Sequence, residues 1–188
     1  MSSSVGILGG AFDPPHNGHV ALAETALEHF AFERLLALVV VDPGHRHVVL
    51  DFPTRFGLAE LAFAGLPRTE VVAEEHRYTA DAIRGGRFGD AIFLVGADEF
   101  ANFLSWKDPN GVLEEVRLGV ATRPGFPPEA LDPVLQGLER PDRVQLFDMP
   151  ELPISGTEIR ARAARGVRVD GLVPLAVAAE IDRLGLYR

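Results

Sequence analysis

The sequence contains no cysteine, and it has only one lysine, one tryptophan and two methionines. Without cysteine the chain has no disulfide, no thiolate zinc site and no cysteine nucleophile. The single lysine, Lys107, does not follow a glycine-rich loop, which excludes a GxxxxGK[ST] phosphate-binding loop. Any Schiff-base chemistry would depend on that one residue.

Positive charge and long apolar runs are also in short supply. The 18 basic residues face 27 acidic ones, and the net charge of −9 argues against a broad nucleic-acid-binding surface, although a local basic pocket for small phosphates stays compatible with it. The longest apolar run, Leu35 to Val41, is far shorter than the ~20 residues that cross a bilayer. The N-terminal segment lacks the basic region of an export signal. We therefore expect a soluble cytoplasmic protein with no nucleic-acid or membrane partner, and a homo-oligomer is compatible with this composition.

Short apolar runs alternate with amphipathic stretches along all 188 residues. The runs at 5–8, 35–41, 71–73, 91–95, 118–121 and 144–147 predict strands. Helices are expected at 18–30, 56–66 and 79–84, near residue 157 and after Pro174. This alternation predicts an α/β, Rossmann-like, doubly wound and mainly parallel sheet with helices on both faces. We expect one domain over 1–188, with the C-terminal helices from about residue 157 packed on it.

The segment after the first predicted strand, residues 9–19, concentrates the chemistry-bearing residue types. Gly9 and Gly10 let the backbone approach a ligand closely, but their spacing is not that of a GxGxxG fingerprint. His16 and His19 share a face on the first turn of the next helix, whose free N–H groups favour anions. A metal could also bind such a pair, but neither a cysteine nor an obvious third histidine accompanies it. The pattern predicts a polyphosphate site. The isolated His29, His47 and His76 receive no functional role.

This segment resembles the signature of nucleotidyltransferases that make dinucleotide cofactors, most closely the nicotinate-nucleotide adenylyltransferase family. The two most specific matches are Gly9-Gly10-x-Phe12-Asp13-Pro14-x-His16-x-Gly18-His19 and Ile154-Ser155-Gly156-Thr157-Glu158-Ile159-Arg160. Between them come Tyr78-Thr79-x-Asp81, Val95-Gly96-Ala97-Asp98 followed by Trp106, and Thr122-Arg123-Pro124-Gly125. Val173-Pro174 and Leu186-Tyr187 resemble the family ending, so the resemblance covers nearly the whole chain.

The resemblance implies transfer of AMP from ATP to nicotinate mononucleotide, giving deamido-NAD and pyrophosphate, with Mg²⁺ accompanying ATP. The sequence itself shows no all-protein site for Mg²⁺, so we expect no metal ligands from the protein. The resemblance also implies catalytic roles for His16, His19 and Arg160. The residues implied for ATP binding are Gly9, Gly10, Ala11, Phe12, Gly18, Gly96, Asp98, Ile154 and Ser155. Those implied for acceptor binding are Arg46, Tyr78, Thr79, Trp106 and Arg123.

Three of these positions also have a purely structural interpretation. Asp98 could be the N-cap of a helix, Trp106 could be partly buried packing, and Arg123 could be an ordinary loop arginine. Two departures from the family pattern stand out. Gly156 replaces a second serine, and Asp42-Pro43-Gly44-His45-Arg46-His47 replaces a Pro-Pro-His-Lys stretch, where Arg46 can carry the charge of the lysine with different reach.

Other functions compete with this one. The acceptor could instead be nicotinamide mononucleotide or phosphopantetheine, or the chain could be a non-catalytic nucleotide sensor. The His-x-Gly-His element also occurs in class I aminoacyl-tRNA synthetases, but their lysine-rich second motif and tRNA-binding domains are missing here. A sensor would be expected to lose catalytic groups, whereas both histidines and Arg160 are present.

Overall fold

The structure is a computed structural model, and it describes residues 5–44, 48–123 and 126–188. Arg46, to which we assign acceptor binding, lies outside the described residues, as do Pro124 and Gly125 of the Arg-Pro-Gly match.

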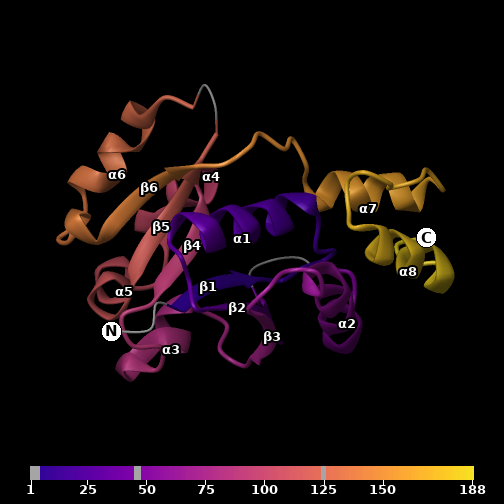
Figure 1. Ribbon diagram of the computed structural model, residues 1–188, viewed down its shortest axis with the longest axis horizontal. Coiled ribbons are helices and arrows are strands. Elements are labelled where there is room, and N and C mark those ends of the chain that lie inside the picture. Colours follow the sequence, from indigo (N-terminus) through magenta and orange to yellow (C-terminus); the bar gives the residue numbers. More distant parts are fainter. Residues whose placement is uncertain (1–4, 45–47, 124–125) are drawn as a thin grey trace.

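Six strands form one sheet, and every neighbouring pair is parallel. They are β1 (Val5–Gly10), β2 (Arg34–Val40), β3 (Thr69–Glu74), β4 (Ile92–Gly96), β5 (Arg117–Thr122) and β6 (Val144–Asp148). Their order across the sheet is β3-β2-β1-β4-β5-β6 (Figure 1). This is the order of a doubly wound dinucleotide-binding fold, in which the chain reverses its direction of travel between β1 and β4. The prediction of a Rossmann-like parallel sheet is confirmed.

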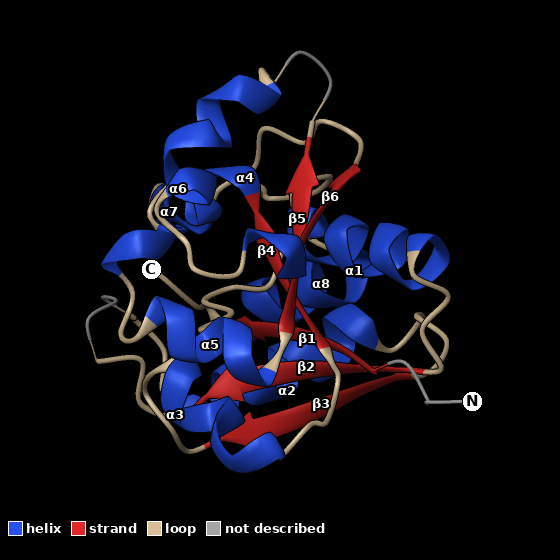
Figure 2. Ribbon diagram, turned by 90° about the vertical axis from the view of Figure 1, so that its left-hand side faces the viewer, coloured by secondary structure: helices blue, strands red, loops and turns tan. Residues whose placement is uncertain are grey.

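Helices cover both faces of this sheet, as the buried strands require. They are α1 (Asn17–His29), α2 (Phe52–Phe63), α3 (Thr79–Ile83), α4 (Ala97–Phe100), α5 (Pro109–Glu115), α6 (Asp132–Gln136), α7 (Gly156–Ala164) and α8 (Leu175–Leu184). Residues of α1, α2, α7 and α8 pack with Leu8, Leu35 and Leu94 on one face. Residues of α3, α4, α5 and α6 pack with Ile7, Leu36 and Phe93 on the other face. Figure 2 shows α3 and α5 on one side of the strands and α1 on the other.

The sequence pattern predicts the strands and the longer helices close to their observed bounds, but it does not predict the short helices α4, α5 and α6. Helix α2 begins at Phe52, four residues earlier than expected, because the Asp51 side chain caps it by accepting from the Thr54 N–H and Pro53 fits its first turn. Helices α4, α5 and α6 were not predicted because they are too short for a clear apolar period. Among the described residues, no helix is long and apolar enough to span a membrane.

The C-terminal helices α7 and α8 lie together at one end of the molecule (Figure 1). Helix α8 packs on α2, and its buried Val177, Ala178 and Ile181 join the apolar cluster that α1 and α2 form with the sheet. This packing brings the end of the chain next to the loop that follows β1.

Candidate active site

Two adjoining cavities open at the carboxyl ends of the central strands, where ligands bind in open α/β sheets. The first has a volume of about 630 Å³, and residues that line it come from β1, β2 and β4 and from the segments around residues 77–82 and 99–107. The second, about 410 Å³, lies between the start of α1 and the segments around residues 96–98, 121–123 and 149–155. His19, Leu22 and Gly96 line both cavities. The two spaces therefore meet beside His19.

The glycines of the loop after β1 are required by close packing. A Cβ atom at Gly9 would lie 2.9 Å from the Phe93 ring, and one at Gly10 would lie 3.1 Å from the Phe12 ring. Phe12 has a φ of 52° and its side chain is buried, with its ring edge-on to that of His19 at 5.0 Å between centroids. Gly9, Gly10 and Ala11 line the first cavity, so their backbone faces the space that also holds the predicted acceptor residues.

The two histidines form a stacked pair at the start of α1. His16 is the N-cap residue, and the two imidazole rings lie 3.7 Å apart between centroids at 25°. The His16 backbone N–H donates to Nδ1 of His19 at 3.2 Å. Because Nδ1 accepts this hydrogen bond, a neutral His19 carries its proton on Nε2. His19 is therefore held as a hydrogen-bond donor through Nε2.

His16 has a buried Nδ1 atom without a hydrogen-bond partner among the described residues. Burial lowers the pKa of His16 to about 4, so this ring is neutral near pH 7. Gly18 leaves room beside it, because a Cβ atom there would lie 3.0 Å from Nδ1. A buried polar atom without a partner next to a cavity is a candidate ligand contact.

Arg160 reaches the same loop from α7. The Ser155 hydroxyl caps this helix by accepting from the Glu158 N–H at 3.2 Å, and Arg160 lies in its first turns. Its Nη1 donates to the Asp13 carbonyl at 2.7 Å and its Nη2 to the Thr157 hydroxyl at 3.2 Å.

The departure at Gly156 has a local explanation. A Cβ atom at this position would lie 3.2 Å from Nη1 of Arg160 and 3.4 Å from the Asp13 carbonyl oxygen. The missing side chain therefore leaves an unobstructed path for the hydrogen bond between Arg160 and Asp13. Ile154 and Ser155, the residues just before Gly156, line the second cavity.

Asp98 and Arg123 contact each other at the second cavity. Gly96 is the N-cap of α4, so the interpretation of Asp98 as the N-cap is wrong. The Asp98 carboxylate instead accepts a hydrogen bond from the Arg123 guanidinium, and both residues line the second cavity. The structure thus groups Arg123 with Asp98, Ile154 and Ser155 at the second cavity, whereas Tyr78, Thr79 and Trp106 line the first.

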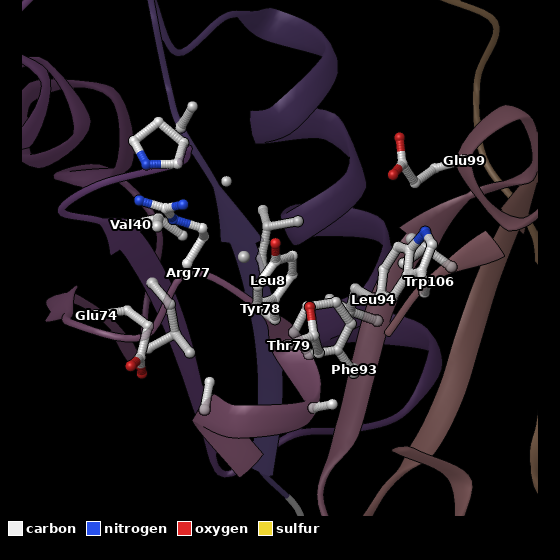
Figure 3. Close-up of a pocket in the computed structure, with 18 of the residues that line it drawn as sticks. Leu8, Val40, Glu74, Arg77, Tyr78, Thr79, Phe93, Leu94, Glu99 and Trp106 are labelled. Carbon is white, nitrogen blue, oxygen red and sulfur yellow. The ribbon is translucent and has the colours of Figure 1, made fainter. Parts of the chain in front are cut away.

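Aromatic side chains shape the first cavity. The Trp106 ring lies edge-on to Phe93 and Phe103, at 6.2 Å and 5.1 Å between centroids, so it packs and lines the cavity at the same time. Tyr78, which is 39% exposed, precedes α3, and Thr79 is the first residue of that helix. Figure 3 shows Tyr78 and Trp106 reaching the cavity from separate segments.

Lys107 is a cavity residue to which the sequence assigned no role. Its Nζ lies 2.8 Å and 2.7 Å from the two carboxylate oxygens of Asp81 and 5.1 Å from the centre of the Tyr78 ring. The hydrogen bond from Lys107 lowers the pKa of Asp81. Two features of the sequence could have indicated that Lys107 lines the site: it directly follows Trp106, and it is the single lysine of the chain.

Arg55 of α2 is a second residue that the sequence did not reveal. Only 1% of it is exposed, and its guanidinium donates to the carbonyls of Ala11, Val40, Val41 and Leu50 at 2.6–3.3 Å. Burial lowers the pKa of Arg55, and the negative charge of Asp13 opposes this effect. Nothing in the sequence around Arg55 predicts these hydrogen bonds, because all four acceptors are backbone carbonyls.

Comparisons with known proteins agree with this geometry. The family profile described as cytidylyltransferase-like matches residues 7–162. A relative from Bordetella pertussis, named probable nicotinate-nucleotide adenylyltransferase, is 37% identical over 98% of each chain. Two solved structures of nicotinic acid mononucleotide adenylyltransferase from Plasmodium falciparum, one complexed with APC and one with NaAD, share the fold. Each has a TM-score of 0.79 and 16% identity and covers 98% of this chain and 97% of its own. The chain therefore belongs to the cytidylyltransferase-like family and, within it, to the nicotinate-nucleotide adenylyltransferases.

Proposed function

We propose that this enzyme transfers AMP from ATP to nicotinate mononucleotide in the cytoplasm, giving deamido-NAD and pyrophosphate. One observation carries the proposal: a cavity lined by Tyr78 and Trp106 meets, at His19, a second cavity that borders the starts of α1 and α7. A group transfer between two bound nucleotides needs such a junction, because the reacting atoms must approach one another with their orientation fixed.

ATP is assigned to the second cavity. The start of α1 and the segment before α7 both border it, and the free N–H groups of helix starts attract phosphate oxygens. His16, with its buried Nδ1, and the Asp98–Arg123 pair would contact the triphosphate and the ribose respectively. Arg160 would hold the β- and γ-phosphates with the part of its guanidinium that Asp13 and Thr157 do not occupy.

Nicotinate mononucleotide is assigned to the first cavity. Trp106 and Tyr78 offer aromatic surfaces on which a pyridine ring can stack. Phosphopantetheine has no such ring. The first N–H groups of α3 have no partner within the helix and can face the ring substituent. A carboxylate accepts stronger hydrogen bonds than a carboxamide does, so this end favours nicotinate over nicotinamide.

In the reaction, a phosphate oxygen of nicotinate mononucleotide attacks the α-phosphorus of ATP. The new phosphorus–oxygen bond forms while the bond to the bridging oxygen breaks, and that oxygen leaves on pyrophosphate with the bonding electrons. The attacking phosphate is already ionised, so no general base is needed and positioning and charge stabilisation supply the acceleration. His19 would donate from Nε2 to the phosphate oxygens as charge develops on them.

Magnesium would enter with ATP and neutralise charge on its phosphates. In the part of the chain that the structure describes, no group of three or more His, Asp or Glu side chains could hold a metal ion. Mg²⁺ at nucleotide sites usually keeps several water ligands and binds substrate phosphates, so the triphosphate would supply its anionic ligands.

The experiment is to incubate the protein with ATP, Mg²⁺ and one acceptor at a time, and to identify any product by mass. Nicotinate mononucleotide should give the highest kcat/KM, above nicotinamide mononucleotide and phosphopantetheine. Equal or reversed preference would refute the acceptor assignment and leave only adenylyl transfer. ATP binding in calorimetry without pyrophosphate release with any acceptor would favour a nucleotide sensor.

A further inference from the structure

The buried Asp13 side chain links its own loop to two distant segments of the chain, through hydrogen bonds from Val49 and Tyr187. Only 6% of this residue is exposed, although it lies in the loop between β1 and α1. Its Oδ1 accepts from the Tyr187 hydroxyl at 2.8 Å, and its Oδ2 accepts from the Val49 N–H at 2.5 Å. Both carboxylate oxygens are therefore held by groups outside the loop.

Tyr187 reaches Asp13 because of how α8 ends. Gly185 is the C-cap of this helix with a φ of 61°, and the Leu186 N–H donates back to the Ile181 carbonyl at 3.0 Å. Tyr187 then has a φ of 66°, a left-handed conformation that costs energy for a residue with a side chain. The conformation turns the phenol toward the loop, where the ring packs against the core.

The Tyr187 hydroxyl keeps its proton, so it can donate the hydrogen bond to the Asp13 carboxylate. Burial, followed by the charge of Asp13, raises the pKa of the Tyr187 hydroxyl far above its ordinary value, while Arg160 and Arg55 act in the opposite direction. At any working pH the hydroxyl can therefore donate to Asp13.

The loop that this bond holds is the one that presents the histidines. Asp13 lies three residues before His16, and its carbonyl accepts from Arg160 at 2.7 Å. Neither Asp13 nor Tyr187 is among the described residues that line the two cavities, so they would act on a substrate only through the loop.

We infer that Tyr187 is a positioning residue for adenylyl transfer: its hydroxyl, through Asp13, fixes the loop so that His19 lies at the junction of the two cavities and His16 lines the second cavity. This inference rests on the proposed function for its catalytic consequence. The contact itself is independent of that function.

The test is Tyr187→Phe, which removes one oxygen and keeps the ring. Displacement of reacting groups by about 1 Å can lower a rate by about 100-fold, so we expect kcat to fall by about 10- to 100-fold. The KM values for ATP and nicotinate mononucleotide should stay within about threefold, since the residues that line the cavities are unchanged. The matched control is Val177→Ala, which removes buried contacts of α8 and should leave kcat unchanged at a temperature where all variants are folded.

A second measurement does not depend on activity. Hydrogen exchange of the backbone in residues 8–19 should be faster in Tyr187→Phe than in the wild type and unchanged in Val177→Ala. The inference is overturned if folded Tyr187→Phe keeps kcat within about twofold of the wild type, if Val177→Ala loses kcat equally, or if exchange in the loop does not change. A wild-type protein that forms no dinucleotide would instead refute the proposed function, while the exchange experiment would still test the link.

Discussion

Replacing His19 by Gln, Asn or Ala tests whether the hydrogen-bond donor at Nε2, and not the imidazole ring as such, accelerates the reaction. Nδ1 accepts from the His16 N–H at 3.2 Å, so only Nε2 can donate to a phosphate from the neutral ring. The amide nitrogen of Gln lies near the position of Nε2, whereas that of Asn lies near Nδ1. His19→Gln therefore keeps a donor at the working position, and His19→Asn and His19→Ala do not.

The expected magnitude follows from the loss of one preorganised donor. Such a loss lowers kcat by about 10²- to 10³-fold, equivalent to about 2.7–4 kcal/mol of transition-state stabilisation. We expect this loss in His19→Ala and His19→Asn. A neutral hydrogen bond contributes about 0.5–1.5 kcal/mol, so His19→Gln should recover roughly two- to tenfold of the rate.

The assay is the initial rate of dinucleotide formation, with thermal melting to show that each variant is folded. His29→Ala is the matched control, because His29 lies at the other end of α1 and stacks on Phe147, away from both cavities. A folded His19→Ala with near wild-type turnover would remove His19 from the mechanism. An Asn variant as active as the Gln variant would contradict the assignment of the proton to Nε2.

Three further predictions concern the acceptor, the buried arginine and pH. Trp106→Ala should weaken binding of nicotinate mononucleotide by ~1–3 kcal/mol while the KM for ATP stays constant, and an equal change in both KM values would contradict a stacking role. Arg55→Met should lower the free energy of unfolding by about 3 kcal/mol or more in urea titrations, because each buried carbonyl left without a donor costs about 1–3 kcal/mol. The exposed, ion-paired Arg34→Met should lower it by at most about 1 kcal/mol, and similar losses in the two variants would refute a stabilising role of the Arg55 hydrogen bonds. Burial lowers the pKa of folded His16 to about 4 from 6.5, so the unfolded state takes up the proton first. Stability should therefore fall by up to about 1.4 kcal/mol per unit as pH drops from 6.5 toward 4, and a His16→Asn variant that keeps the same slope would exclude His16 as its cause.

The sequence predicted the parts of the fold and site that local pattern determines. Buried parallel strands read as continuous apolar runs, and the segments after them meet at one edge of the sheet. The loop with His16 and His19 lies beside the two cavities, and its pattern was readable because its glycines, its histidines and the helix start are neighbours in the chain.

Contacts between distant segments could not be predicted in this way. Arg55 binds backbone carbonyls, which leave no trace in the side-chain pattern, and its spacing in α2 is that of an ordinary helical arginine. Arg123 was grouped with the acceptor residues, but its position depends on the pairing of β5 with β4, which brings it to Asp98. Short helices such as α5 depend on caps, here Asp108 and Pro109, more than on periodicity.

The strand order also has a consequence for the folding kinetics of the chain. Strands β1, β2 and β3 follow one another in sequence and pair as neighbours, and so do β4, β5 and β6. Within the sheet, the pairing of β1 with β4, in which Gly6 faces Ile92, joins the two halves. Closing that long loop loses chain entropy before any contact across it forms, so we expect each half to assemble first and the seam between them to close late. The nucleotides would bind along this seam, and by mass action they would hold the two halves together against opening.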